Sequence, residues 1–476
     1  MSCLSFIIVH LSFAVLVILA GAVAAAEEPP LPPGLGGESK SEEPALPPGL
    51  GEPETPGQTP ESPAEKPLAD RLPFDLTGFW DLRGGFRVQD DDHQPAHSLG
   101  ETRLQLELEK AFDDGLTLHL TADLLYDMIA NDRRVFLDEG RGVLDLREAW
   151  AAFRPTSFMD VKVGRQILTW GTGDLVFLND LFPKDWNAFL IGRDVEYLKA
   201  PSDALKVSLF SDLANLDLVY TPRFDADRFV DGRYISYYNP LLGRRAGRDA
   251  LVDPVDRDGC FRDDEFAARA YRRFGAVEAA LYGYYGFWKS PEGTDPATLR
   301  PRHPRLAAYG ASVRGPVGPG IGNVEAVYYD SMEDRPGTDP FTPNSQVRLL
   351  AGYEQDLDAV SRDLSVGLQY YVEIRVNHDA WEATRAGLAP DETRDRHVVT
   401  VRLTKLLLNQ NLELSLFTFF SPTDADCYMR PRVAYKVTDQ WRVEMGANVF
   451  FGNHKHTFFG QFEDNSSLYF GTRYSF

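Results

Sequence analysis

The side chains of this chain that could do chemistry are arginines and carboxylates that recur at alternate positions of otherwise apolar segments. Arginines dominate these alternate positions in the last segments of the chain, whereas carboxylates dominate them in the early segments. The residues predicted to line a polar interior and bind a small ion are Arg402, Arg430, Arg432, Arg442, Arg473, Glu107 and Asp123. An arginine fork holds a carboxylate or a phosphate through two parallel hydrogen bonds, so the basic group predicts a preference for anions. The alternative is that these charges pair with one another inside a filled interior.

Residues for catalysis or metal binding do not show a comparable pattern. The acidic stretch Asp90–Asp92 with His93 and His97 lacks distinctive ligand spacing, which favours a solvated loop. The chain contains no C-x-x-C, C-x-x-C-H or H-E-x-x-H motif, and no spacing selects a nucleophile with its base. The sequence therefore predicts that the protein is not an enzyme and needs neither cofactor nor metal. Cys260 and Cys427 would be the cysteines left after removal of a signal peptide. They could form a disulfide or stay as two free thiols.

The connection from Trp170 to Pro201 differs from an ordinary exposed loop. It contains GTGDLVFLNDLFPKDWNAFLIGRDVEYL, with two leucine–phenylalanine clusters and several acids. So many apolar residues would not be expected in water, which predicts that the segment packs inside the fold. Asp174, Phe177, Asp180 and Trp186 are the residues expected to narrow an internal path. The alternative is that the segment 171–190 only plugs or braces a wall.

The elements that must position these side chains are predicted strands of about ten residues with alternating hydrophobicity. In RLQLELE, residues 103–109, three leucines face one side and charged or amide side chains face the other. Transmembrane β-barrel strands have this length and alternation, and aromatic residues near their ends. Eighteen segments fit between residues 77 and 476, and a count of 16 to 20 is compatible with the pattern. The predicted fold is an all-β, transmembrane antiparallel β-barrel.

The last strand, NSSLYFGTRYSF, and the lengths of the connections complete this prediction. Short turns alternate with long connections, as in barrels with short periplasmic turns and long external loops. An open edge in hydrocarbon would leave backbone groups unpaired, so the strand 465–476 is predicted to pair with the strand 77–88. Aromatic residues at Phe476 and Tyr474 resemble the C-terminal assembly signal of bacterial outer-membrane barrels, which implies the barrel assembly machinery as a partner.

The N-terminal 72 residues have a different composition. Residues 1–26 are apolar and end in Ala-Ala-Ala, which predicts a cleaved signal peptide, with an uncleaved anchor helix as the alternative. Residues 27–72 are rich in Pro and Glu, and predict a disordered periplasmic linker before a barrel domain at 73–476. LPPGLG occurs twice in it, either as a motif for a periplasmic partner or as duplicated linker.

Two stretches resemble a known family. GRQILTWGTGDLV at 164–176, followed by Trp186, and PRVAYKVTDQWRVEMGANVFFG at 431–452 resemble alginate-export-type and related uncharacterised porin-like proteins. The resemblance implies a single barrel in the outer membrane of a Gram-negative bacterium, among lipid and lipopolysaccharide, with a passive path for solutes.

These observations predict a porin-like channel for small or oligomeric anionic solutes. The net charge of −22 argues against a nucleic-acid partner, because phosphate binding needs a basic surface. Two alternatives remain at this stage: a scaffold barrel that sheathes or anchors a partner protein such as an electron conduit, and a barrel enzyme.

Overall fold

The computed structural model describes residues 74–113, 115–257, 259–385 and 393–476. The predicted signal peptide and the predicted linker lie outside these residues, so both stay predictions. Within the described residues, no helix is both long and apolar enough to cross a membrane.

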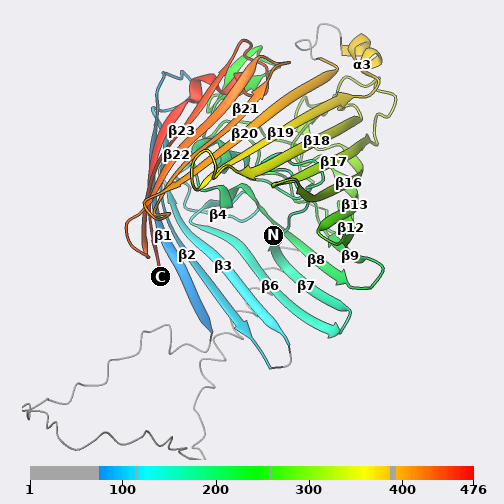
Figure 1. Cartoon of the computed structure of the whole chain (residues 1–476). Coiled ribbons are helices and arrows are strands. Elements are labelled where there is room, and N and C mark those ends of the chain that lie inside the picture. The colour runs from blue at the N-terminus through cyan, green and yellow to red at the C-terminus, as the bar shows by residue number, and fades with distance from the viewer. Residues whose placement is uncertain (1–73, 114, 258, 386–392) are drawn as a thin grey trace, which may run out of the picture.

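Eighteen antiparallel strands form one sheet that curls into a barrel (Figure 1). The first nine are β1 (Asp75–Arg87), β2 (His97–Ala111), β3 (Thr117–Asp127), β6 (Leu144–Thr156), β7 (Met159–Ile167), β8 (Pro201–Leu209), β9 (Asn215–Thr221), β12 (Glu265–Phe274) and β13 (Val277–Phe287). The second nine are β16 (Arg305–Val317), β17 (Gly320–Ser331), β18 (Gln346–Asp356), β19 (Leu364–Arg375), β20 (Asp395–Leu407), β21 (Leu412–Ser421), β22 (Asp426–Lys436), β23 (Trp441–Gly452) and β24 (Ser467–Ser475). The prediction of a β-barrel of about eighteen strands is confirmed.

The barrel closes where the first strand meets the last. β24 pairs antiparallel with β1, with Phe79 opposite Ser475 and Arg87 opposite Ser467. Beyond the ladder, the amide of Gly78 donates to the carbonyl of Phe476 at 3.1 Å, and the amide of Phe476 donates back at 3.0 Å. The predicted pairing of the two chain-terminal strands is therefore confirmed.

The two rims of the barrel carry connections of different length. One rim holds short turns such as 112–116, 275–276 and 437–440, together with the C-terminus (Figure 1). The other rim holds the long loops, which carry the short strands β4 (Val135–Phe136), β5 (Arg141–Gly142), β10 (Tyr237–Asn239), β11 (Arg244–Ala246), β14 (Gly293–Thr294) and β15 (Pro301–Arg302). The same loops hold the helices α2 (Trp186–Ile191) and α3 (His378–Arg385) and the 3-10 turns η2 (Val195–Leu198) and η3 (Gly460–Asn465).

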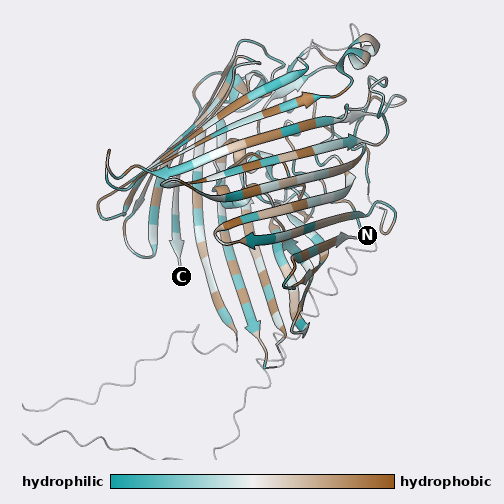
Figure 2. Ribbon diagram, turned by 45° about the vertical axis from the view of Figure 1, so that its right-hand side comes forward, coloured by the Kyte–Doolittle hydropathy of each residue, from teal (hydrophilic) through white to brown (hydrophobic). Residues whose placement is uncertain are grey.

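The wall strands present an apolar face outward and a polar face inward. In β1, Trp80, Leu82 and Phe86 are exposed, while Asp81 and Arg83 between them are buried. Figure 2 shows the same alternation of apolar and polar residues along the strands. A closed barrel with an apolar exterior satisfies every backbone group while it faces lipid.

The apolar core lies inside the barrel, between the wall and the loops that fold into it. Leu125 and Phe450 lie on the inward faces of their strands, where the alternation otherwise places polar side chains, and both are buried. Phe450 stacks on Tyr428 with 4.3 Å between ring centroids and meets Phe462 of η3. Apolar side chains on the inward face therefore mark places where a loop packs against the wall. Cys260 and Cys427 are free thiols, so the structure contains no disulfide between them.

Candidate functional site

The loop between β7 and β8, residues 168–200, fills much of the lumen and is called the inner loop below. Its first part is fastened to the opposite wall by Glu325 of β17, which is only 1% exposed. The Glu325 carboxylate accepts hydrogen bonds from the amides of Thr172 and Gly173, from the Thr172 hydroxyl at 2.8 Å and from Asn179 Nδ2 at 2.7 Å. Four donors from one loop thus converge on a single buried carboxylate.

Asp174 in the same part of the inner loop contacts two further wall strands. Its amide donates to Gln369 Oε1 at 2.7 Å, and Gln369 Nε2 donates to the Asp174 carbonyl at 2.8 Å. Its carboxylate accepts two hydrogen bonds from Arg402 of β20, one of them from Nη2 at 2.6 Å. The main chain and the side chain of Asp174 are therefore held by different residues.

The helix α2 packs the middle of the inner loop against β21 and β22. Asp185 caps the helix by accepting from the Ala188 amide at 2.7 Å. Phe189 makes edge contacts with Phe419 and Tyr428, and the Arg430 guanidinium lies 4.4 Å from the Phe189 ring centroid. This aromatic cluster closes that side of the lumen.

Gly192 ends α2 in the left-handed conformation, with φ of 96°. A Cβ at this position would lie 2.5 Å from the ring of Tyr469, so glycine is required for both conformation and space.

The last part of the inner loop is held by ion pairs. Arg193 Nε lies 2.8 Å from a Glu101 oxygen, and Arg473 Nη2 lies 2.7 Å from a Glu196 oxygen. Because Glu101 lies on β2 and Arg473 on β24, this part of the loop spans the barrel seam.

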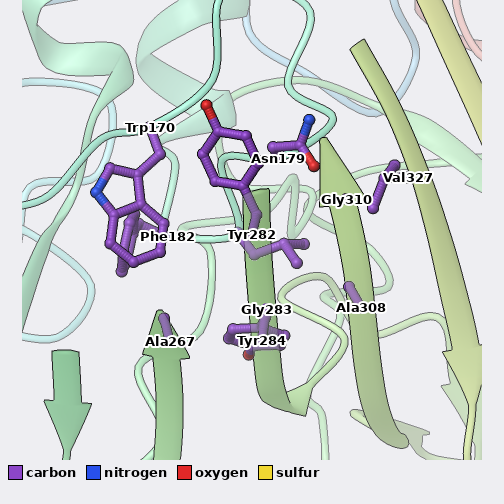
Figure 3. Close-up of a pocket in the computed structure, with 11 residues that line it drawn as sticks. Trp170, Asn179, Phe182, Ala267, Tyr282, Gly283, Tyr284, Ala308, Gly310 and Val327 are labelled. Carbon is purple, nitrogen blue, oxygen red and sulfur yellow. The ribbon is translucent and has the colours of Figure 1, made fainter. Parts of the chain in front are cut away.

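A small apolar pocket lies between the inner loop and the wall (Figure 3). Trp170 and Phe182 come from the loop, and Tyr282, Ala308 and Val327 come from the wall. A neighbouring glycine, Gly310, allows close approach of the loop, because a Cβ there would lie 1.7 Å from Asn179 Oδ1. Small wall residues thus make room for the bulky loop.

The four predicted constriction residues lie in different surroundings. Asp174 is half-exposed beside Arg402, whereas Asp180 is buried and pairs with Lys184 at 2.9 Å. Phe177 and Trp186 pack edge-on with 6.1 Å between centroids. Trp186 Nε1 donates to Asp227 Oδ2 at 2.9 Å, and burial raises the pKa of Asp227. Of the four, Asp180 is buried, Phe177 and Trp186 are partly buried, and Asp174 lines a polar recess.

All seven predicted lumen residues face inward, but they fall into two groups. Asp123 belongs to the filled part: it is fully buried, and Arg103 Nη1 lies 2.6 Å from its carboxylate. Arg430 and Arg473 are partly exposed and contact the inner loop at Phe189 and Glu196. Arg402, Arg432, Arg442 and Glu107 are also partly exposed. Within the second group, Arg432 and Arg442 both pair with Glu413 of β21. Mutual pairing of charges therefore occurs at both depths, and the role of the accessible arginines in selecting anions stays a prediction.

A polar recess lies beside the start of the inner loop. It encloses about 400 Å³, part of it open to solvent, and its charged lining residues are Arg314, Arg402, Asp174 and Glu354. Arg314 and Glu354 are exposed, and within the described residues neither forms an ion pair or a side-chain hydrogen bond. Alternation places both on inward faces, but neither was predicted to bind a solute. Nothing in the sequence of their strands shows that the first part of the inner loop lies beside them.

One group of carboxylates among the described residues has metal-ligand spacing. Oxygens of Asp138, Asp203 and Asp225 lie within 4.8 Å of one another at the long-loop rim. Arg223 Nη2 lies 2.8 Å from Asp138, and Arg165 Nε lies 3.1 Å from Asp203. These guanidinium groups occupy the places in which a cation would be expected.

The closed ring, its apolar exterior and its polar lumen together decide the class of fold. The chain has the fold of bacterial outer-membrane β-barrels. No protein-family model and no curated protein sequence matches it. Solved structures similar to this barrel include OccK3 (OpdO) of Pseudomonas aeruginosa, at 12% identity and a TM-score of 0.49, over 84% of this chain and 96% of that chain.

OccAB1 of Acinetobacter baumannii is similar at 10% identity and a TM-score of 0.48, over 84% of this barrel chain and 95% of that chain. A mutant of a Rh. blastica porin is similar at 8% identity and a TM-score of 0.36, over 85% of this chain and 100% of that chain. Identities this low concern the fold alone. The resemblance to alginate-export-type proteins stays a prediction.

Proposed function

We propose that this barrel is a porin-like channel in the outer membrane that passes small anionic solutes passively. The observation that carries the proposal is the inner loop, which folds into the lumen and leaves an arginine-lined recess open beside it. A loop held inside a barrel restricts the size of what can pass, and the charges left accessible select its sign.

The proposed preference for anions rests on the accessible arginines. Arg314 forms no ion pair within the described residues, and Arg402 and Arg442 keep part of their side chains exposed. Their pairs are of the half-exposed kind, which solutes and salt can displace, unlike the buried pair of Arg103 with Asp123. Glu107 and Glu354 also face the lumen, so the proposal is a preference rather than exclusion of cations.

The occupied lumen supports a channel over a scaffold that sheathes a partner protein. The inner loop contacts β17, β19 and β20 on one side, β21 and β22 on another, and β2 and β24 across the seam. A threaded polypeptide would have to displace many of these contacts together, whereas a small solute would need to displace at most the half-exposed pair of Asp174 with Arg402.

Planar bilayers test the proposed channel directly. Purified protein is expected to produce discrete conductance steps, and the reversal potential in a potassium chloride gradient is expected to report anion preference. Arg402→Gln combined with Arg442→Gln should shift the reversal potential toward cations. Arg134→Gln, in the loop after β3 and highly exposed, is the control and should leave it unchanged. Absence of conductance, or cation preference of the wild-type protein, would contradict the proposal.

A further inference from the structure

The recess beside the inner loop contains a carboxylate already bound to an arginine. Asp174 and Arg402 meet through two hydrogen bonds, from Arg402 Nε and Nη2 to the two Asp174 oxygens. This is the two-point geometry with which a guanidinium binds a carboxylate. Both side chains remain accessible: Asp174 is 41% exposed and Arg402 is 35% exposed.

We propose that the recess formed by Arg402 and Arg314 is a binding site for organic carboxylates, and that the Asp174 side chain occupies it as a resident competitor. The inference rests on the proposed function, since it names the solute class and the place in the lumen where the solute binds. An entering carboxylate would replace Asp174 on Arg402 and would gain Arg314 as a second cation.

The Asp174 carboxylate can leave Arg402 without moving the inner loop. The backbone of Asp174 is held on both sides by Gln369, and the preceding residues Thr172 and Gly173 are held by Glu325. Rotation of the Asp174 side chain breaks only its contacts with Arg402. A half-exposed ion pair contributes little free energy, so a solute at moderate concentration can compete with it.

The Arg402 guanidinium is held ready for an incoming ligand. It lies over the ring of Phe417 with 4.8 Å to the centroid, which fixes its plane when Asp174 is displaced. Arg314 of β16 lines the same recess, as does Asn323 of β17, whose Nδ2 donates to the carbonyl of Thr172 at 3.2 Å and so holds the edge of the inner loop. Glu354 is the opposing charge in the lining. With Asp174 turned away, two guanidinium groups face one carboxylate, so the recess favours an anion.

Binding of acetate to the full-length protein in detergent micelles tests the site without any measurement of conduction. Saturation-transfer NMR is expected to detect acetate on the wild-type protein. Asp174→Asn should tighten binding by about two- to fivefold, because it removes a competitor of the strength of an exposed ion pair. Arg402→Gln should weaken acetate binding at least tenfold. Arg402→Lys should bind with an affinity between those of the wild type and Arg402→Gln, because lysine keeps the positive charge but cannot form two parallel hydrogen bonds. Arg134→Gln should bind acetate like the wild type.

Three outcomes would overturn the proposed site: unchanged or weaker acetate binding by Asp174→Asn, wild-type binding by Arg402→Gln, or no detectable binding by the wild type. The carboxylate assignment would also be overturned if inorganic phosphate bound with the same dependence on Arg402 while acetate did not bind. Gel mobility of unheated samples confirms that each variant forms the barrel. Acetate binding without conductance would contradict the channel alone, whereas conductance without an effect of Asp174→Asn on binding would contradict the site alone.

Discussion

At the scale of single residues, two carboxylates of the lumen have opposite roles. Glu325 is buried and accepts hydrogen bonds from three residues of the inner loop. Asp174 is half-exposed, and its carboxylate contacts one arginine. A buried carboxylate surrounded by neutral donors holds structure, because any replacement leaves those donors unsatisfied. An accessible carboxylate on an arginine can instead exchange with a solute.

Glu325→Gln is expected to loosen the inner loop. A glutamine oxygen can still accept from Thr172 and Gly173, but its amide group would then oppose Asn179 Nδ2, donor against donor. This mismatch and the loss of charge-assisted hydrogen bonds should cost about 3 kcal/mol. We expect a lower thermal unfolding midpoint and noisier conductance. Glu107→Gln is the control, because Glu107 is half-exposed and distant from these donors. Equal behaviour of the two variants would show that Glu325 does not hold the loop.

At the scale of elements, the loops of the long-loop rim pack on one another as well as on the wall. His303, between β15 and β16, is buried, and its ring lies 4.9 Å from that of Phe224 in the loop after β9. Its Nδ1 lies 3.0 Å from the carbonyl oxygen of Trp288, to which the neutral ring donates. Burial, together with the charges of Arg257 and Lys289, lowers the pKa of His303 to about 4.

This pKa shift predicts a dependence of stability on pH. An exposed histidine in the unfolded chain takes up a proton near pH 6.5, whereas folded His303 resists it until about pH 4. The contribution of His303 is therefore complete above pH 6.5 and declines between pH 6.5 and 4, by at most about 1.4 kcal/mol per pH unit. Thermal midpoints at pH 7.5, 5.5 and 4.5 should fall more steeply for the wild type than for His303→Gln. If the thermal midpoints of the wild type and His303→Gln fall equally with pH, His303 is not the source of the pH dependence.

At the scale of the whole molecule, closure depends on one seam between strands that are farthest apart in the sequence. β1 and β24 pair over nine residues, and Phe476 adds two backbone hydrogen bonds to Gly78 beyond the ladder. The inner loop contacts both sides of this seam through Glu101 and Arg473. Wall closure and loop docking therefore stabilise each other.

Deletion of Phe476 is expected to reduce the amount of closed barrel recovered from membranes. The deletion removes both hydrogen bonds to Gly78 and the aromatic contact with Tyr474, whose ring centroid lies 6.3 Å away. The fraction of heat-modifiable protein on gels measures this loss. Ser475→Ala keeps the backbone and the terminal aromatic residue, so it should assemble normally. Normal assembly of the deletion variant would contradict a role for the last residue.

The sequence by itself determined the wall. Side chains of a strand alternate with period two, so the apolar pattern predicted about eighteen strands, their facing and their closure, including the inward positions of Arg402, Arg442 and Glu107. It also indicated that the segment around Trp186 packs inside, because exposed apolar residues would be unfavourable in water.

Only the tertiary structure decided what the inner loop touches. Glu325, Gln369 and Arg402 are 146 or more residues from their loop partners, and each strand offers several inward polar residues of similar type. The alternation within one strand specifies which of its side chains point inward. It does not specify which inward side chains of other strands will contact the inner loop. The partners are chosen by closure of the ring, which places β17, β19 and β20 opposite β7. The closed ring also leaves one carboxylate, Glu325, buried where it holds the loop, and another, Asp174, accessible beside Arg402.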